Sequence, residues 1–399
     1  MLNKITVAKF WMVSSFFAAA SVFAKDCNNT PAPATKSCPK KTCEQKCEQP
    51  CELPAAPTLA AYSAPARINV CGSWDFYATG TFLYWQAQQE NMELGIAVND
   101  GTADLVPFDI TGTTPNPGSV INMDFDFKPG FKLGLGMNFE YDNWDGYAEY
   151  TWFHETNTQS SNGPATNSAI WLMGYHPRLL GTTTPVATSA SENWRLKMDF
   201  VDLLLARAHY VGTKLSFRPF VGARGAWIRQ RVNYAASLQN ATVATALGVA
   251  NNQSLASNQN SRSWGIGPEI GLDTNWMFGY GLRMTAKAEA DLLYTRYTTT
   301  TGETVTNLNT GAIITRDEIS QKHSDYLRPH ANLEMGFGWG TYFDNNKWHF
   351  DLLATYGFQV FWNQNMFRHF TDDIVRASSN APNGDLFVQG LNLTARFDF

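Results

Sequence analysis

The sequence lacks a run of about 18 apolar residues, the length that a helix needs to cross a bilayer, so helical membrane spans are excluded. Charged residues are also scarce: they make up 16% of the chain, against about 25% in a water-soluble globular domain. Aromatic residues reach 14%, and there are 30 glycines among the 399 residues. This combination is typical of a transmembrane β-barrel, in which lipid-facing residues alternate with polar ones.

Catalytic and nucleotide-binding motifs are missing as well. The sequence contains no phosphate-binding loop, no H-E-x-x-H, no G-x-S-x-G and no dinucleotide-binding fingerprint. Its seven histidines are scattered, and none is singled out as the partner of a serine nucleophile. The net charge of −5 gives no reason to expect a nucleic acid as partner. We therefore expect a protein that is not an enzyme and that has no cofactor and no metal.

Residues 1–24 have the pattern of a secretory signal peptide. Lys4 and Lys9 supply the positive start, an apolar run follows at 10–20, and Ala24 ends an acceptable cleavage site. The apolar run is too short to span a bilayer comfortably. The sequence therefore predicts an exported chain.

All six cysteines fall in the next segment, residues 25–73, which is rich in Pro, Ala, Lys and Gln and has little to pack into a core. They are Cys27, Cys38, Cys43, Cys47, Cys51 and Cys71. An even number of cysteines in an exported protein favours disulfides. We expect a periplasmic arm whose disulfides lie either within the arm or between it and other copies or other envelope proteins. A metal site is disfavoured because the arm has no Cys-x-x-Cys pair and no His.

Residues 74–399 read as ten strand-like stretches joined by connections that alternate in length. The short ones are 141–143, 212–215, 279–280 and 344–347, and the long ones are about 87–123, 157–192, 235–261, 299–324 and 363–384. Tight periplasmic turns alternating with long outer loops are the layout of a transmembrane barrel. We predict an all-β protein with a transmembrane antiparallel β-barrel of about 10–12 strands, the higher number if the stretch 92–98 adds strands.

The final stretch, Leu391 to Phe399, alternates strictly between apolar and polar residues and ends on a phenylalanine. An aromatic end of this kind is typical of the closing strand of an outer-membrane barrel. We expect Phe397 and Phe399 to act as the insertion signal, read by the bacterial barrel-insertion machinery. The sequence thus predicts a protein of the bacterial outer membrane, with membrane lipid as its surroundings.

The alternation also predicts which charged residues face the barrel interior. The proposed lumen residues are Lys132, Arg195, Lys197, Arg207, Arg218, Arg224, Glu269, Arg283, Lys287, Glu289, Asp291, Arg328, Glu334 and Arg396. In the stretch 193–211 this register places Trp194 and Phe200 toward lipid, and Asp202 interrupts the apolar face as a bulge or an interface position.

Two functions are compatible with such an interior. A wall of mixed charge favours a porin-like role, the passive diffusion of small polar solutes. The alternative is a structural, disulfide-cross-linked envelope protein or a surface adhesin with a narrow or plugged lumen. Barrel size decides between them: about eight strands leave an interior filled by side chains, whereas 16 to 18 leave a channel.

Several blocks of the body carry a resemblance to a known family. They are Phe82–Trp85, Phe125–Phe139, Trp144–His154, Asp202–Tyr210 and Phe217–Arg224. On these blocks the chain resembles the major-outer-membrane-protein-like family of Legionella and chlamydia-related bacteria. The resemblance implies an abundant outer-membrane barrel with a porin or structural role and without catalytic residues. The cysteine-rich arm departs from the family pattern and is similar to the disulfide-linked envelopes of chlamydiae.

Deletion of Phe399 is expected to impair insertion into the outer membrane more than it impairs export, because the closing strand loses its terminal aromatic residue. The measurement is heat-modifiable gel migration of the protein recovered from the outer membrane. A deletion variant that gives the normal amount of heat-modifiable barrel would refute this role for Phe399.

Overall fold

The computed structural model describes residues 62–72, 74–99, 118–139, 141–162, 168–171, 186–238, 253–370, 379–380 and 383–399. The regular secondary structure of these residues consists of β-strands. No helix long and apolar enough to cross a membrane occurs among them. The predicted signal peptide and most of the cysteine-rich arm lie outside the described residues.

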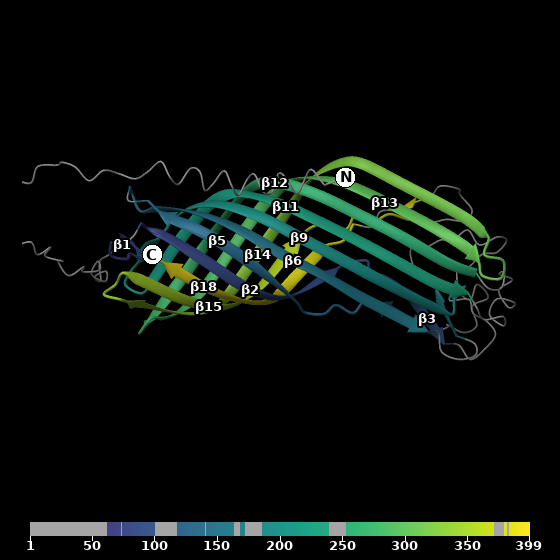
Figure 1. The fold of residues 1–399 in the computed structure, drawn as a ribbon, viewed down its shortest axis with the longest axis horizontal. Coiled ribbons are helices and arrows are strands. Elements are labelled where there is room, and N and C mark those ends of the chain that lie inside the picture. The colour runs from purple at the N-terminus through teal and green to yellow at the C-terminus, as the bar shows by residue number, and fades with distance from the viewer. Residues whose placement is uncertain are drawn as a thin grey trace, which may run out of the picture. The chain divides into compact units, whose positions relative to one another are not determined.

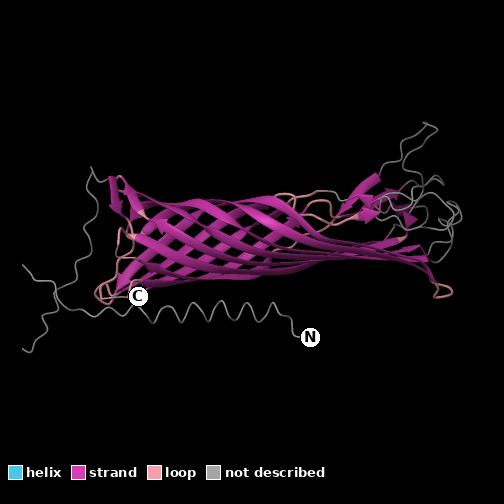
Figure 2. Cartoon of the chain, turned by 90° about the horizontal axis from the view of Figure 1, so that it is seen from above, coloured by secondary structure: helices cyan, strands magenta, loops and turns pink. Residues whose placement is uncertain are grey.

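Ten antiparallel strands form a closed barrel (Figures 1 and 2). They are β2 (Phe76–Gln89), β5 (Lys128–Asn138), β6 (Trp144–Asn162), β9 (Ser189–Arg207), β11 (Leu215–Leu238), β12 (Gln253–Gly279), β13 (Leu282–Asn307), β14 (Ile313–Phe343), β15 (Trp348–Phe361) and β18 (Leu386–Asp398). The last strand, β18, pairs with β2 through Leu391 opposite Tyr84, which closes the ring. The predicted fold class and the count of ten strands are confirmed.

The remaining strands are short. β10 (His209–Val211) continues β9 along β11, and β1 (Tyr62–Pro65) pairs with β10. β16 (His369–Phe370) pairs with β17 (Ser379–Asn380) in a separate two-stranded sheet. Within the long connections, β3 (Glu93–Asn99), β4 (Gly118–Asn122), β7 (Ser168–Trp171) and β8 (Val186–Ala187) form a separate four-stranded sheet. The stretch 92–98 therefore adds a strand to this small sheet and not to the barrel.

The short turns are built from residues that tolerate a left-handed backbone. Asp142 and Asn143 have φ values of 62° and 56°, and Asp344, Asn345 and Asn346 have φ values between 49° and 64°. Asn and Asp adopt this region more readily than other non-glycine residues, so these turns reverse the chain within a few residues. All four short connections lie at one end of the barrel, and the strand ends that lead into the long connections lie at the other.

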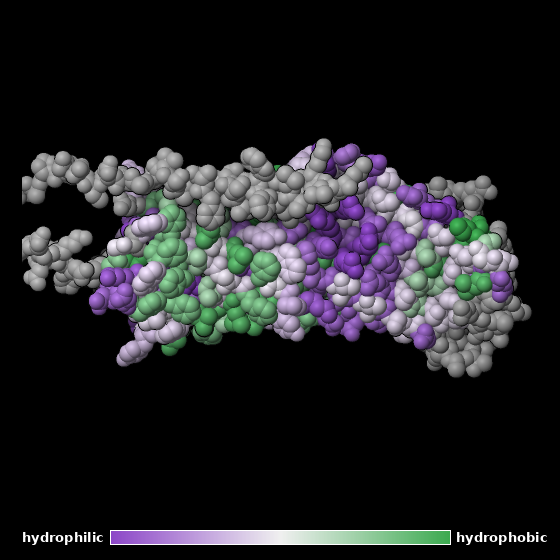
Figure 3. All heavy atoms as spheres, viewed as in Figure 1, coloured by the Kyte–Doolittle hydropathy of each residue, from purple (hydrophilic) through white to green (hydrophobic). Residues whose placement is uncertain are grey.

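The outward face carries an apolar band next to the short turns. Figure 3 shows this band over the half of the molecule that carries these turns, followed by a hydrophilic zone. On β12, Trp264 and Trp276 point outward at the two edges of the band, and Ile266 and Ile270 lie exposed between them. Twelve residues of a strand tilted by about 45° rise by roughly 28 Å, close to the apolar height of an outer-membrane barrel. Beyond this band the strands continue toward the long connections, to 31 residues in β14.

In β5, β6, β11, β12, β13, β14, β15 and β18 the exposed apolar residues lie on the face that the sequence assigns to lipid. The predicted orientation is wrong for β9, where the alternation is shifted by one residue and Arg195, Lys197 and Arg207 lie on the outward face. The reason is that Trp194 is fully buried in an apolar core inside the barrel, and Asp202 is buried beside an arginine there. Because a strand has a period of two, one misassigned position reverses every side chain.

Leu333 tests the position of the membrane band. Its side chain is 60% exposed on the outward face of β14, midway between Leu327 and Trp339. Substitution Leu333→Arg is expected to lower the free energy of unfolding by about 2–4 kcal/mol in lipid vesicles, because a lipid-facing arginine near the midplane loses its hydration. Thr306→Arg, on the outward face of β13 beyond the band and opposite Ile313 and Ser254, is the control and should leave the urea midpoint unchanged. Equal midpoints for both variants would place the band elsewhere.

Candidate functional site in the barrel interior

Most of the predicted lumen residues do face the interior. These are Lys132, Arg218, Arg224, Glu269, Arg283, Lys287, Glu289, Asp291, Arg328, Glu334 and Arg396. The structure brings them together as pairs and clusters, so the interior is a network of neutralised charges.

The layer nearest the short turns is held by arginines that each bind carboxylates. Arg218 contacts Asp145 at 2.5 Å and Asp273 at 2.6 Å, so it links β6, β11 and β12. Arg396 contacts Asp398 at 2.6 Å on the closing strand. Arg283 forms an ion pair with Asp351. Glu334 and Arg328 lie further from the short turns and form hydrogen bonds to neutral partners. Glu334 accepts hydrogen bonds from Asn332 and Thr355. Arg328 donates a hydrogen bond to the Tyr297 hydroxyl.

The middle layer is organised around Arg224 of β11. Its guanidinium lies 2.6 Å from Asp202, 3.3 Å from Glu269, 2.6 Å from Glu289 and 2.8 Å from Asp291. Arg224 is only 5% exposed, and these four carboxylates are buried too. One cation thus ties together strands β9, β11, β12 and β13 by charge-assisted hydrogen bonds, which are the strong ones.

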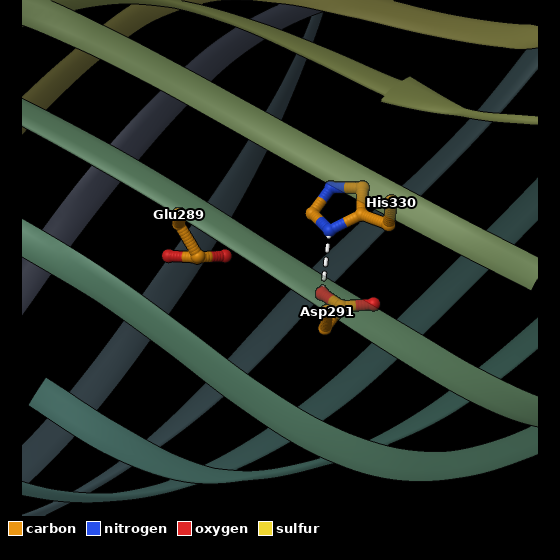
Figure 4. Close-up of side chains that lie close together, drawn as sticks. All are labelled: Glu289, Asp291 and His330. Atoms are coloured by element: carbon orange, nitrogen blue, oxygen red, sulfur yellow. Dashed lines mark hydrogen bonds and ion pairs between the residues drawn. The ribbon is translucent and has the colours of Figure 1, made fainter.

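Neighbouring groups extend this layer. Lys287 lies 2.5 Å from Glu289, and Lys132 lies 3.4 Å from Glu149 across the interior wall. The His330 Nδ1 atom lies 2.6 Å from an Asp291 carboxylate oxygen, an arrangement that Figure 4 shows beside Glu289.

Glu289, Asp291 and His330 also have the residue types of a metal site, with ligand atoms within 4.8 Å of one another. The guanidinium of Arg224 already contacts both carboxylates and also lies 3.0 Å from His330 Nδ1. The protein's own arginine therefore supplies the positive charge that a bound metal would supply.

Aromatic side chains from opposite walls meet above the Arg224 layer. The rings of Phe200 on β9 and Phe361 on β15 stack with centroids 5.5 Å apart. In the order of the ring, β9 and β15 are five strands apart out of ten, so they are diametrically opposed. Phe361 also stacks on His330, with centroids 4.1 Å apart. The contact therefore crosses the full width of the interior.

The next layer toward the long connections is apolar. Leu83, Trp85, Phe153, Trp194, Leu196 and Met198 are fully buried in one cluster, supplied by β2, β6 and β9. The segment after β15 folds into the same region: Phe367 is buried in the cluster, and the Tyr297 hydroxyl donates to Gln364 at 2.8 Å. The interior at this level is packed like the core of a globular protein.

The sequence did not predict two features that close the interior: the inward carboxylate of Asp202 and the stack of Phe200 on Phe361. Asp202 was the available signal, because a carboxylate in a face otherwise assigned to lipid is costly and argues for the opposite register. Phe200 and Phe361 gave no such signal, because an aromatic residue suits a lipid face and a packed interior equally well.

Glu303 and Glu192 lie inside the barrel extension beyond the membrane band. Burial raises the pKa of Glu303 on β13 to about 8 and that of Glu192 on β9 to about 7, with the carboxylates of Asp317 and Glu93 adding to the respective effect. These carboxyl groups therefore retain protons near neutral pH, unlike exposed glutamates.

Comparison with known proteins identified one family. A family model described as the Legionella pneumophila major outer membrane protein precursor matches residues 69–399. No curated protein matches the sequence.

Solved structures resemble the barrel only weakly. The outer membrane protease OmpT from Escherichia coli has 7% identity and a TM-score of 0.41, over 84% of this chain and 99% of that one. The Pseudomonas putida toluene transporter TodX has 10% identity and a TM-score of 0.30, over 86% and 98%. A Pseudomonas aeruginosa FadL homologue has 10% identity and a TM-score of 0.27, over 82% and 90%. Likeness at this level transfers no function to the chain.

Arg224→Met is expected to destabilise the barrel by about 3–5 kcal/mol, because it removes the cation that four buried carboxylates share and leaves only Lys287 beside Glu289 and His330 beside Asp291. The measurement is the urea midpoint of heat-modifiable migration in lipid vesicles. Arg207→Met is the matched control: Arg207 pairs with Asp142 at 2.9 Å in an exposed position, and its loss should cost under about 1 kcal/mol. A midpoint for Arg224→Met equal to that of the wild type would contradict the assigned role.

Proposed function

Because the chain belongs to the Legionella major outer membrane protein family, we propose that it is a closed outer-membrane barrel with a structural role in the cell envelope. The observation that carries this proposal is the stack of Phe200 on Phe361, from opposite walls, at 5.5 Å. An open pore for polar solutes needs a continuous water-filled path, and the two rings lie across that path.

The charged layer below supports the same conclusion. Arg224, Glu269, Glu289, Asp291 and His330 are each at most 6% exposed, so solvent hardly reaches them. Charges that filter solutes in a pore line water, whereas these bind one another. The mixed charge that favours passive diffusion in the sequence thus serves packing in this geometry.

Strand number is consistent with a filled interior. A ring of ten strands is only slightly wider than the eight-stranded barrels that side chains fill. Long side chains such as Arg224 and Lys287, together with stacked phenylalanines, span the small additional width. Passive diffusion remains the second candidate and requires the phenylalanine stack and the Arg224 layer to separate.

In a structural role, the cysteine-rich arm would serve to cross-link the barrel to its surroundings. The Cys71 backbone N–H donates to the carbonyl of Asn346 at 2.8 Å, which places Cys71 at the end of the barrel with the short turns. Cys71 is disulfide-bonded, and the other five cysteines lie outside the described residues, so the pairing stays a prediction. Because the disulfide of Cys71 lies within the chain, cross-links to other copies or to periplasmic envelope proteins would come from the remaining cysteines of the arm. Ladders on non-reducing gels that collapse with thiol would support such links.

Planar-bilayer recording tests the closed interior. Purified protein is expected to give no discrete, reproducible conductance steps, and liposomes that contain it should not swell in small sugars. Heat-modifiable gel migration of the protein from the same liposomes verifies insertion. An absence of conductance can then not be attributed to protein that failed to insert. Regular conductance steps from inserted protein would overturn the proposal in favour of the porin.

A further inference from the structure

A row of cations lies on the outward face just beyond the apolar band. Lys197 on β9, Arg229 on β11 and Arg262 on β12 are directly opposite one another across neighbouring strands. Arg195 and Arg231 form a second pair two residues further from the band. We call these five residues the basic row.

The basic row lies at the height of the membrane surface. Two residues closer to the membrane on the same strands, Trp227 faces Trp264, and Trp152 lies on β6 beside them. Outward tryptophans mark the interface of a barrel with the lipid headgroups. Because this edge of the band faces the long connections, the basic row lies in the outer leaflet.

Among the described residues, these cations have no ion-pair partner. Like charges directly opposite each other on neighbouring strands are destabilising. Within the described residues, no carboxylate forms an ion pair with Lys197, Arg229 or Arg262, and Arg231 donates only to the Asn260 side chain at 2.7 Å. Within the part of the chain that the structure describes, Asp199 on this face is buried, accepts a hydrogen bond from the Tyr150 hydroxyl at 2.8 Å and lies 3.6 Å from His154 Nε2. An anion from outside would relieve the repulsion.

A groove of about 680 Å³ adjoins the row on β2, β5, β6 and β9. Phe82, Phe131 and Trp152 give it an apolar floor, and the rings of Phe131 and Trp152 stack at 5.3 Å. Arg195 and Lys197 line its other side. An apolar floor in contact with a cationic edge fits an amphiphile that has both hydrocarbon chains and an anionic head.

We propose that the basic row and this groove bind a phosphorylated lipid of the outer leaflet. The phosphate groups are held by Lys197, Arg229 and Arg262, and the hydrocarbon chains lie along the aromatic floor. Arginine forms two parallel hydrogen bonds to a phosphate, and lysine adds a point charge, so the row suits a head with more than one phosphate.

The test is native mass spectrometry of the detergent-solubilised full chain titrated with diphosphoryl lipid A. The row variant carries Lys197→Gln, Arg229→Gln and Arg262→Gln. Its affinity is expected to fall about tenfold or more, because charge-assisted contacts to phosphate are lost. The charge-matched control carries Arg207→Gln, Lys214→Gln and Lys347→Gln at the end with the short turns, and should bind like the wild type. Equal affinity of the row variant and the wild type would overturn the proposal.

Measurements on the wild type keep the proposal falsifiable even where the row variant does not fold. Binding should weaken as salt rises and should be much tighter for diphosphoryl lipid A than for the same lipid without its phosphates. Equal binding of the two lipids, or of phosphatidylcholine, would refute recognition of phosphate. Two outcomes would refute the assignment to a lipid. One is that inorganic phosphate competes for the basic row as well as diphosphoryl lipid A does. The other is that a sulfated polysaccharide binds the basic row more tightly than diphosphoryl lipid A does.

Discussion

The backbone hydrogen bonds between β18 and β2 are the constraint on which the rest of the structure depends. They close the sheet, and only a closed sheet leaves no unpaired edge in a medium without water. Closure at ten strands sets the width of the interior. At that width an aromatic residue on one wall reaches its partner on the opposite wall, as Phe200 reaches Phe361. The filled interior is thus a consequence of where the ring closes.

The ring itself could be predicted from the sequence because its signals are local. Alternating residues assign the faces of β12 and β13 without knowledge of any other strand, and Asn- and Asp-rich turns separate the strands. The register of β9 could not be predicted in this way, because the strand carries apolar residues on both faces in different parts of its length. Trp194 and Met198 are apolar and inward beyond the membrane, whereas Leu203 and Leu205 are apolar and outward within it. A rule that equates the apolar face with lipid fails where the interior is also apolar.

The pairing of charges in the interior was beyond the sequence for a different reason. The cation and its partners come from four different strands. Only the registers of those strands bring the carboxylates of Asp202, Glu269 and Asp291 within 3.3 Å of the Arg224 guanidinium. Sequence reasoning placed three of them in the lumen and assigned Asp202 to a bulge or an interface. The error with Asp202 and the error in the β9 register are one error, since reversing the strand turns the carboxylate inward.

The same reversal also separates two populations of cations that the sequence treats alike. Arg224 faces inward, where water is excluded, and a buried guanidinium requires carboxylates from the protein. Lys197 and Arg229 face outward at the membrane edge, where the surroundings can supply anions, and they have no carboxylate partner among the described residues. The odd or even position of a cation along a strand determines whether it faces inward or outward. That position therefore also determines whether the protein or the membrane must supply the opposite charge.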